Sequence, residues 1–157
     1  MTLSSGSSMT STVGSVGVSD AAITRRVVVG VDGSERSRIA LQRAAVEATA
    51  HDAVLEVVHA WNFLDQPGPD FDPDYGETKA RVRIDTFITD VLGVDRPAEA
   101  TVTLINDHPS PALVSAADGA FMVVVGARGL GGFRGLLVGS VSQHVMHHAG
   151  CPVLVVR

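Results

Sequence analysis

Glycine is concentrated in one stretch of the chain, residues 126–141, which reads GARGLGGFRGLLVGSV. Six of the sixteen glycines of the chain lie within it. An apolar run, residues 121–125, precedes this stretch, and a segment with helical character, residues 140–149, follows it. Glycine lets a backbone approach an oxyanion closely, and the first N–H groups of a helix supply donors and the positive end of its dipole. A strand, a glycine-rich turn and a helix start in this order predict a phosphate-binding loop.

Two common phosphate-binding loops do not fit these residues. The Walker A loop needs GxxxxGK followed by Ser or Thr, whereas the single lysine of the chain, Lys79, lies far from the glycine-rich stretch. The dinucleotide fingerprint needs a third glycine where Arg134 stands, and an acidic residue about twenty positions further on. No acidic residue follows the stretch in this sequence. The loop is therefore expected to bind a nucleotide in another way.

No catalytic group is indicated by spacing. His144 and His148 would share one helix face as a possible metal pair, but no third ligand lies within reach by sequence. Histidines in a last helical turn also favour the negative end of the helix dipole. Cys151 precedes Pro152 and an apolar run, which favours a buried, inert thiol. We expect no catalytic residue and no metal site built from the protein alone.

Apolar runs and helical patterns alternate along the rest of the chain. Valine-rich runs without alternation are typical of strands buried on both faces, and apolar residues at three-to-four spacing indicate helices that pack on a sheet. We predict strands at residues 25–32, 53–60, 100–105, 121–125 and 151–157, and helices capped by Ser34, over 80–91, near 112–117 (opened by Pro109 or Pro111) and over 140–149. This order predicts an α/β fold with a parallel sheet and helices on both faces.

Two further patterns concern the first helix and the connection after the second strand. The first helix has a face of small residues that suits close packing on a sheet, formed by Ser37, Ala40, Leu41, Ala44, Ala45 and Ala48. The connection at 61–74 is long for an α/β protein and contains Trp61, Phe63 and Phe71. Such a connection is either a lid over a site or a satellite hydrophobic cluster.

The third and last strands are expected at the edges of the sheet. Thr101 and Thr103 alternate with apolar residues, which indicates a strand with one less buried face. The last run is apolar, and an uncovered apolar edge strand is a liability. Pairing with the same strand of a second copy would cover it. We therefore predict a homodimer through Val153, Leu154, Val155 and Val156.

Composition sets limits on the class of protein. The net charge of −5 argues against sequence-independent nucleic-acid binding, and no apolar run is long enough for a membrane helix. A single cysteine allows no internal disulfide and indicates a reducing compartment. Residues 1–22 are rich in Ser, Gly and Thr and do not resemble a secretory signal. We expect a disordered tail at 1–22, one domain at 23–157, and a cytoplasmic location.

The glycine spacing, GxxG followed after nine residues by Gly139-Ser140, combines with VVGVDGS in the first strand and CPVLVV at the end of the chain. Together these motifs resemble the ATP-binding branch of the universal stress protein family, over nearly everything except the tail. The resemblance implies an open five-stranded parallel sheet in the order 3-2-1-4-5, as in Rossmann-like and adenine nucleotide alpha hydrolase-like folds, and dimerisation through the last strand. In that order the sheet changes direction between strands one and four, and ligands bind at the carboxyl ends beside such a point.

The resemblance also implies roles for individual residues. The stretch Gly129, Leu130, Gly131 and Gly132 would hold the β and γ phosphates, and Ser140 and Val141, after Gly139, would donate to phosphate. Gly126 and Ala127 would border the ribose or α-phosphate, while Gly30, Val31, Asp32 and Ala60 would line the opposite wall beside the adenosine. Asp32 could instead form only an Asx-type turn, or approach a phosphate-bound Mg²⁺. Arg128 and Arg134 would either neutralise phosphate or be solvated loop charges.

Three functions follow from these expectations. The first is a regulatory, stress-response homodimer that binds ATP, with Mg²⁺, as a switch. The second is a slow ATPase or phosphotransferase, although neither an arginine-finger arrangement nor a base for water is evident. The third is a structural dimer with no nucleotide.

Overall fold

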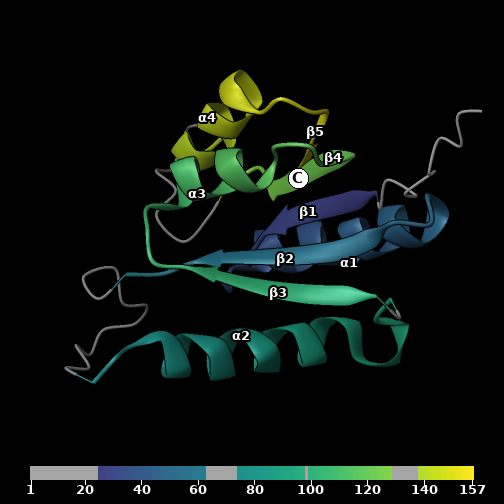
Figure 1. Cartoon of the computed structure of the whole chain (residues 1–157). Helices are drawn as coiled ribbons and strands as arrows, with labels where there is room; N and C mark the ends of the chain where they lie inside the picture. The colour runs from purple at the N-terminus through teal and green to yellow at the C-terminus, as the bar shows by residue number, and fades with distance from the viewer. Residues whose placement is uncertain (1–24, 63–73, 98, 129–137) are drawn as a thin grey trace, which may run out of the picture.

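The computed structural model describes residues 25–62, 74–97, 99–128 and 138–157. Figure 1 shows a central sheet with helices on both sides. The predicted tail at 1–22 and most of the long connection, residues 63–73, lie outside the described residues. Among the described helices, none is long and apolar enough to cross a membrane.

Five parallel strands form the sheet in the order β3-β2-β1-β4-β5. They are β1 (Arg26–Gly30), β2 (Val54–Ala60), β3 (Ala100–Ile105), β4 (Met122–Gly126) and β5 (Val153–Val156). The predicted order is confirmed, and so is the placement of the third and last strands at the two edges. The last strand is shorter than predicted, because Pro152 has no N–H for the ladder, although its carbonyl accepts a hydrogen bond from Val123 N at 3.0 Å.

In the described part of each crossover there is one α-helix. These are α1 (Glu35–Ala50), α2 (Glu77–Leu92) followed by the 3-10 turn η1 (Gly93–Asp95), α3 (Pro109–Ala116) and α4 (Ser140–His148). Of the two prolines proposed to open the third helix, Pro109 does so. The helix begins ahead of the predicted 112, because the His108 side chain accepts from Ser110 N at 3.4 Å and caps it.

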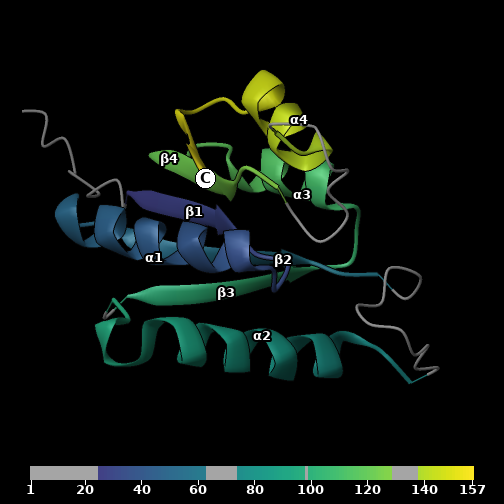
Figure 2. The same cartoon turned by 180° about the vertical axis from the view of Figure 1, so that it is seen from behind.

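The helices cover the sheet in two layers, which Figures 1 and 2 show from opposite sides. On one face, α1 and α2 enclose a core that includes Val27, Val29, Leu41, Leu55 and Ile84. On the other, α3 and α4 enclose a core around Val28, Leu113, Val123 and Val145. Alternate valines of β1 therefore point into different cores, which explains why its apolar run is continuous. The small-residue face predicted for α1 is confirmed, since all six of its residues are buried.

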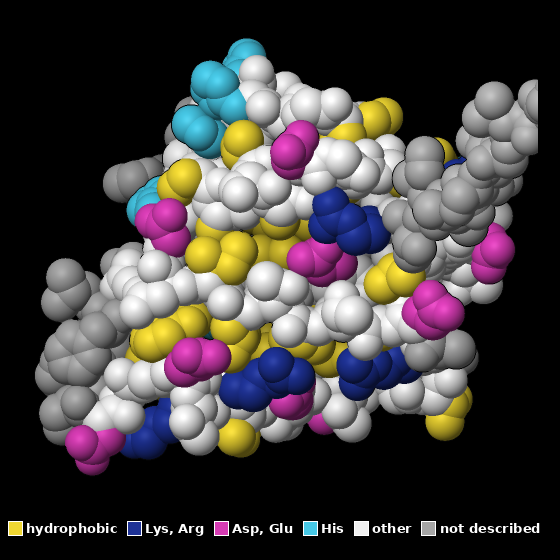
Figure 3. All heavy atoms as spheres, in the orientation of Figure 1, with side chains coloured by type: hydrophobic (Ala, Val, Ile, Leu, Met, Phe, Trp, Pro, Cys, Tyr) yellow, Lys and Arg dark blue, Asp and Glu magenta, His cyan; other side chains and the backbone are white. Residues whose placement is uncertain are grey.

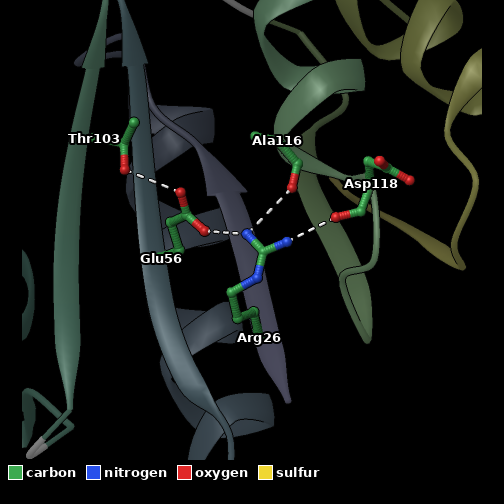
Figure 4. A network of polar contacts seen from close by, with 5 residues as sticks. All are labelled: Arg26, Glu56, Thr103, Ala116 and Asp118. Atoms are coloured by element: carbon green, nitrogen blue, oxygen red, sulfur yellow. Dashed lines mark hydrogen bonds and ion pairs between the residues drawn. The ribbon is translucent and has the colours of Figure 1, made fainter. Parts of the chain in front are cut away.

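A polar network crosses the sheet toward the amino ends of its strands (Figure 4). Arg26 in β1 forms an ion pair with Glu56 in β2 and donates to the carbonyl oxygens of Ala116 at 3.4 Å and Asp118 at 2.7 Å. The other carboxylate oxygen of Glu56 accepts from the Thr103 hydroxyl of β3 at 2.9 Å. The network therefore ties three strands to the end of α3, and it lies away from the carboxyl edge, where the predicted site residues are.

Candidate functional site

Those predicted site residues that the structure describes lie at the carboxyl edge of the sheet, where its direction changes between β1 and β4. These two strands are neighbours, with Val29 opposite Val124. Gly30 ends β1, and Gly126 ends β4. Val31 and Asp32 continue from one strand and Ala127 and Arg128 from the other. The two sequence motifs, which lie far apart along the chain, thus emerge side by side at a position where ligands bind in open α/β sheets.

The two ends of the glycine-rich stretch are joined at the end of β4. The N–H of Gly139 donates to the carbonyl oxygen of Ala127 at 2.6 Å, and Ala127 N donates to Val156 O at 2.6 Å. The Ser142 hydroxyl donates to the carbonyl oxygen of Gly126 at 2.6 Å. These bonds fix the start of α4 against the end of β4. The predicted phosphate contacts of Gly129, Leu130, Gly131, Gly132 and Arg134 lie outside the described residues and stay predictions.

Helix α4 begins without a side-chain cap. Its N-cap residue is Gly139, and the structure gives it no side-chain cap hydrogen bond, whereas Ser34 caps α1 by accepting from Ser37 N at 3.2 Å. Ser140, the first residue of α4, is exposed, and Val141 is half-buried. The first N–H groups of a helix need an acceptor, and an anion satisfies both them and the positive end of the dipole. This helix start can therefore accept a phosphate group.

The turn that follows β1 is held by its own side chains. Asp32 Oδ1 accepts from Ser34 N at 2.9 Å, which is the Asx-type turn that the sequence left as an alternative for this residue. Gly33 has a φ of +85°, a conformation that favours glycine. Asp32 therefore stabilises the turn that follows β1 through one oxygen of its carboxylate.

Two residues at this turn were not predicted from the sequence. His59 in β2 is 5% exposed, and its Nδ1 lies 2.9 Å from the carbonyl oxygen of Val31. Arg83 in α2 donates from Nη2 to the carbonyl oxygen of Asp32 at 3.4 Å. A histidine within an apolar strand is only a weak signal for a contact with the turn. Arg83 lies in an ordinary helical pattern, which gives no signal for its contact with Asp32.

The pKa of His59 is lowered from its ordinary value of 6.5, chiefly because burial disfavours the charged ring. The hydrogen bond with Val31 O opposes this shift, the Arg83 guanidinium adds to it, and the Asp32 carboxylate opposes it. His59 is accordingly neutral at pH 7. Its Nε2 is buried and has no hydrogen-bond partner among the described residues.

Two glycines at the strand ends make room for helices. A Cβ on Gly126 would lie 3.0 Å from backbone and side-chain atoms of Arg36, at the start of α1. A Cβ on Gly30 would lie 2.7 Å from Leu113 Cδ1 of α3. The close neighbour of Gly126 in the structure is therefore the first turn of α1, so this glycine is required by packing, whatever a ligand adds.

At the end of β2, Ala60 pairs with Ile105 of β3 and leads into the long connection. Trp61 N donates to Ile105 O at 2.9 Å. The rings of Trp61 and Tyr75 meet edge to face, with centroids 6.4 Å apart. Contact between these aromatic residues holds the two described ends of the connection together beside Ala60, and whether residues 63–73 form a lid lies outside the described residues.

The remaining candidates are Arg128, at this edge, the histidines of α4, and Cys151. Arg128 is half-buried just beyond β4. The rings of His144 and His148 lie 4.3 Å apart on α4, where histidine side chains gather in Figure 3. Within the described ranges, no group of three or more His, Cys, Asp or Glu residues could hold a metal ion. Cys151 is half-buried, whereas a buried thiol was predicted, and its partial burial raises the pKa of the thiol, in keeping with an unreactive cysteine.

Comparison with known proteins gives concordant matches. The model of the universal stress protein family matches residues 24–157. The Thermus aquaticus protein named "Universal stress protein in QAH/OAS sulfhydrylase 3′region" is 34% identical over 139 residues, which are 85% of this chain and 98% of that protein. "Universal stress protein Rv2005c" of Mycobacterium tuberculosis is 37% identical over 134 residues, 83% of this chain but 45% of that protein. The chain thus spans less than half of this mycobacterial relative.

A solved structure has the same fold with a ligand in place. It is described as a universal stress protein in complex with cAMP, and it is 29% identical to this chain with a TM-score of 0.66. The match covers 85% of this chain and 97% of that one.

Proposed function

Because this chain belongs to the universal stress protein family, we propose that it binds ATP at the carboxyl edge of the sheet and acts as a nucleotide-dependent regulator in a stress response. The observation that carries the proposal is the start of α4. It has no side-chain cap, and the bonds from Gly139 to Ala127 and from Ser142 to Gly126 hold it beside the end of β4.

The phosphates of the nucleotide belong at this helix start. The N–H groups of Ser140 and Val141 donate to phosphate, and the glycine-rich stretch adds further backbone donors. Because this phosphate-binding loop contains no lysine, its positive potential comes from backbone N–H groups and the helix dipole. Arg128, half-buried just beyond the end of β4, would add to this potential. Mg²⁺ bound to the phosphates would lie within the reach of Asp32.

The adenosine belongs on the other side of the switch point. Gly30, Val31, Asp32 and Ala60 end or follow β1 and β2 at the same edge, and they would line the wall beside the adenosine. Support for an adenine nucleotide comes from the cAMP complex of the structural neighbour, which shares the fold. In ATP, the triphosphate then extends from β1 toward α4.

A regulatory role suits the described residues better than catalysis does. Asp32 is engaged in the turn, the Ser142 hydroxyl donates to Gly126 O, and His59 is buried against Val31. Hydrolysis needs a group that orients water and a cation that stabilises the transition state. The described side chains at this edge thus hold backbone in place, which favours binding over turnover.

We further propose a homodimer through Val153, Leu154, Val155 and Val156. These residues form the edge strand β5, which pairs with β4 on one side. Val153 and Val155 pack on the core of α3 and α4, while Leu154 and Val156 pack on the core of α1 and α2. Because the side chains are occupied on both faces, the contact with a second copy would form mainly through main-chain pairing at the edge.

Native mass spectrometry of freshly purified full-length protein tests the proposed ligand. We expect a nucleotide mass on each chain, and its release by denaturation followed by chromatography identifies it. An adenine nucleotide supports the proposal. A non-nucleotide ligand, or an empty chain that also fails to take up added ATP and cAMP, contradicts it.

A further inference from the structure

The buried imidazole of His59, in β2, forms a hydrogen bond with the turn that follows β1. A carbonyl oxygen can only accept a hydrogen bond, so the 2.9 Å contact between His59 Nδ1 and Val31 O requires the hydrogen on Nδ1. This assigns the tautomer of the ring: Nδ1 donates, and Nε2 keeps its lone pair. The bond links β2 to the residue immediately before Asp32.

Neighbouring backbone groups of the same turn are also engaged. Val31 N donates to Val58 O at 3.0 Å, which continues the pairing of β1 with β2. Arg83 Nη2 donates to Asp32 O and lies over Gly33, where an added Cβ would come within 2.8 Å of it. The path of residues 31–33 is therefore set by β2 and α2 as well as by the Asx turn.

We propose that His59 is a positioning residue of the nucleotide site, which holds Val31 and Asp32 in the geometry that binding requires through the Nδ1–H bond to Val31 O. This rests on the proposed function, since Val31 and Asp32 form the adenosine wall of the site. A misplacement of about 1 Å can slow a reaction about 100-fold, and binding through directional hydrogen bonds depends on position for the same geometric reason.

Three substitutions separate the hydrogen bond from the packing of the ring. His59→Asn places an amide nitrogen at the position of Nδ1, His59→Gln places one at the position of Nε2, and His59→Leu provides neither. Calorimetric titration of each full-length variant with ATP gives the Kd, and thermal unfolding gives the Tm. We expect His59→Asn to bind within about threefold of the wild type, and His59→Gln and His59→Leu to bind about tenfold or more weakly.

Comparison of Kd with Tm decides between positioning and mere structural support. The proposal is supported if only His59→Asn, which keeps a donor at the position of Nδ1, keeps its ATP affinity, and if the affinities do not follow the order of the Tm values. Equal affinity in all three variants overturns it, and so does affinity that falls only in step with Tm.

The tautomer provides a test that does not depend on the nucleotide. Long-range ¹H–¹⁵N NMR spectra of the unliganded protein should show the His59 hydrogen on Nδ1 at pH 7. A hydrogen on Nε2 alone would remove the bond to Val31 and overturn the proposal even if ATP binds. If the tautomer is as expected but the wild type binds no nucleotide, the proposed function fails and the positioning role fails with it.

Discussion

The backbone N–H of Gly139 lies 2.6 Å from the carbonyl oxygen of Ala127, so the two ends of the glycine-rich stretch meet where β4 ends. The first turn of α4 therefore starts beside the switch point of the sheet, close to the turn that begins at Val31. This relationship brings a helix N-terminus and the β1 turn to one edge, and it makes the proposed nucleotide site testable by single substitutions.

A carboxylate at the start of α4 should compete with the phosphates. Gly139→Asp replaces one tolerated N-cap residue by another, so the fold should be retained, with a gain in stability of only about a few tenths of a kcal/mol. The same carboxylate occupies the anion position and repels phosphate, so ATP affinity should fall by about tenfold or more. Titration calorimetry and urea unfolding measure the two effects.

Gly76→Asp is the matched control for this substitution. Gly76 is the N-cap residue of α2, also without a side-chain cap bond, and nothing lies within 4 Å of an added Cβ. This variant should likewise gain only about a few tenths of a kcal/mol in stability, without any change in ATP affinity. Equal losses of affinity in both variants would show that the added charge, and not its position at α4, is responsible.

Gly126 should tolerate no side chain, because of the first turn of α1. An added Cβ lies 3.0 Å from Arg36 backbone atoms, so Gly126→Ala should lower the free energy of unfolding by about 1–3 kcal/mol. Gly150→Ala, where nothing lies within 4 Å, should change it by less than about 0.5 kcal/mol. Urea denaturation compares the two, and equal stability of the variants would contradict the packing role of Gly126.

The Arg26–Glu56 pair should contribute more than a surface ion pair. The Glu56 side chain is 13% exposed and also accepts from Thr103, so Glu56→Ala leaves Arg26 and Thr103 without this partner. We expect a loss of about 1–3 kcal/mol in the free energy of unfolding. Asp85→Ala breaks the exposed Arg81–Asp85 pair and should cost less than about 1 kcal/mol. A larger loss for Asp85→Ala would contradict this ranking.

The free energy of unfolding should fall at acidic pH, where His59 takes up a proton. Its folded-state pKa is below the ordinary 6.5, so below pH 6.5 the unfolded chain binds this proton more readily than the folded chain. The contribution is intact above pH 6.5 and is lost as the pH falls toward the folded-state pKa. His59→Asn cannot titrate, so the stability difference between wild type and variant should shrink between pH 7 and pH 5. A constant difference over this range would contradict the assignment.

The assembly can be measured directly by light scattering at micromolar concentration. Pairing of β5 with its copy predicts a particle of twice the 16.3 kDa chain mass. A monomer under these conditions would contradict the proposed interface.

The strands and the helices were predicted well from the sequence, because the patterns that indicate them are local. The alternation of Thr101 and Thr103 placed β3 at an edge, and the three-to-four spacing of small residues identified the whole buried face of α1. The start of α3 was less well defined, because a His108 N-cap is not a common signal. Motifs at Asp32 and Gly126, together with the family resemblance, placed both at one edge of the sheet.

Contacts between distant side chains were beyond such patterns. Arg83 reaches Asp32 across 51 positions of sequence, and nothing in its own helix marks it. The apolar strand around His59 indicated burial but not its bond to Val31. The missing side chain of Gly126 makes room for Arg36, which the sequence did not indicate, and its predicted place beside the ribose or α-phosphate stays a prediction. These features depend on how separate strands and helices meet in the fold, and spacing along one element does not contain that information.

Calorimetric titration of the full-length wild-type protein, freed of any co-purified ligand, with ATP and Mg²⁺ tests the central claim most directly. We predict saturable binding of one nucleotide per chain, with the affinity reduced in Gly139→Asp and unchanged in Gly76→Asp. Absence of saturable binding at concentrations up to about 1 mM, which corresponds to a binding free energy weaker than about −4 kcal/mol, would contradict the account.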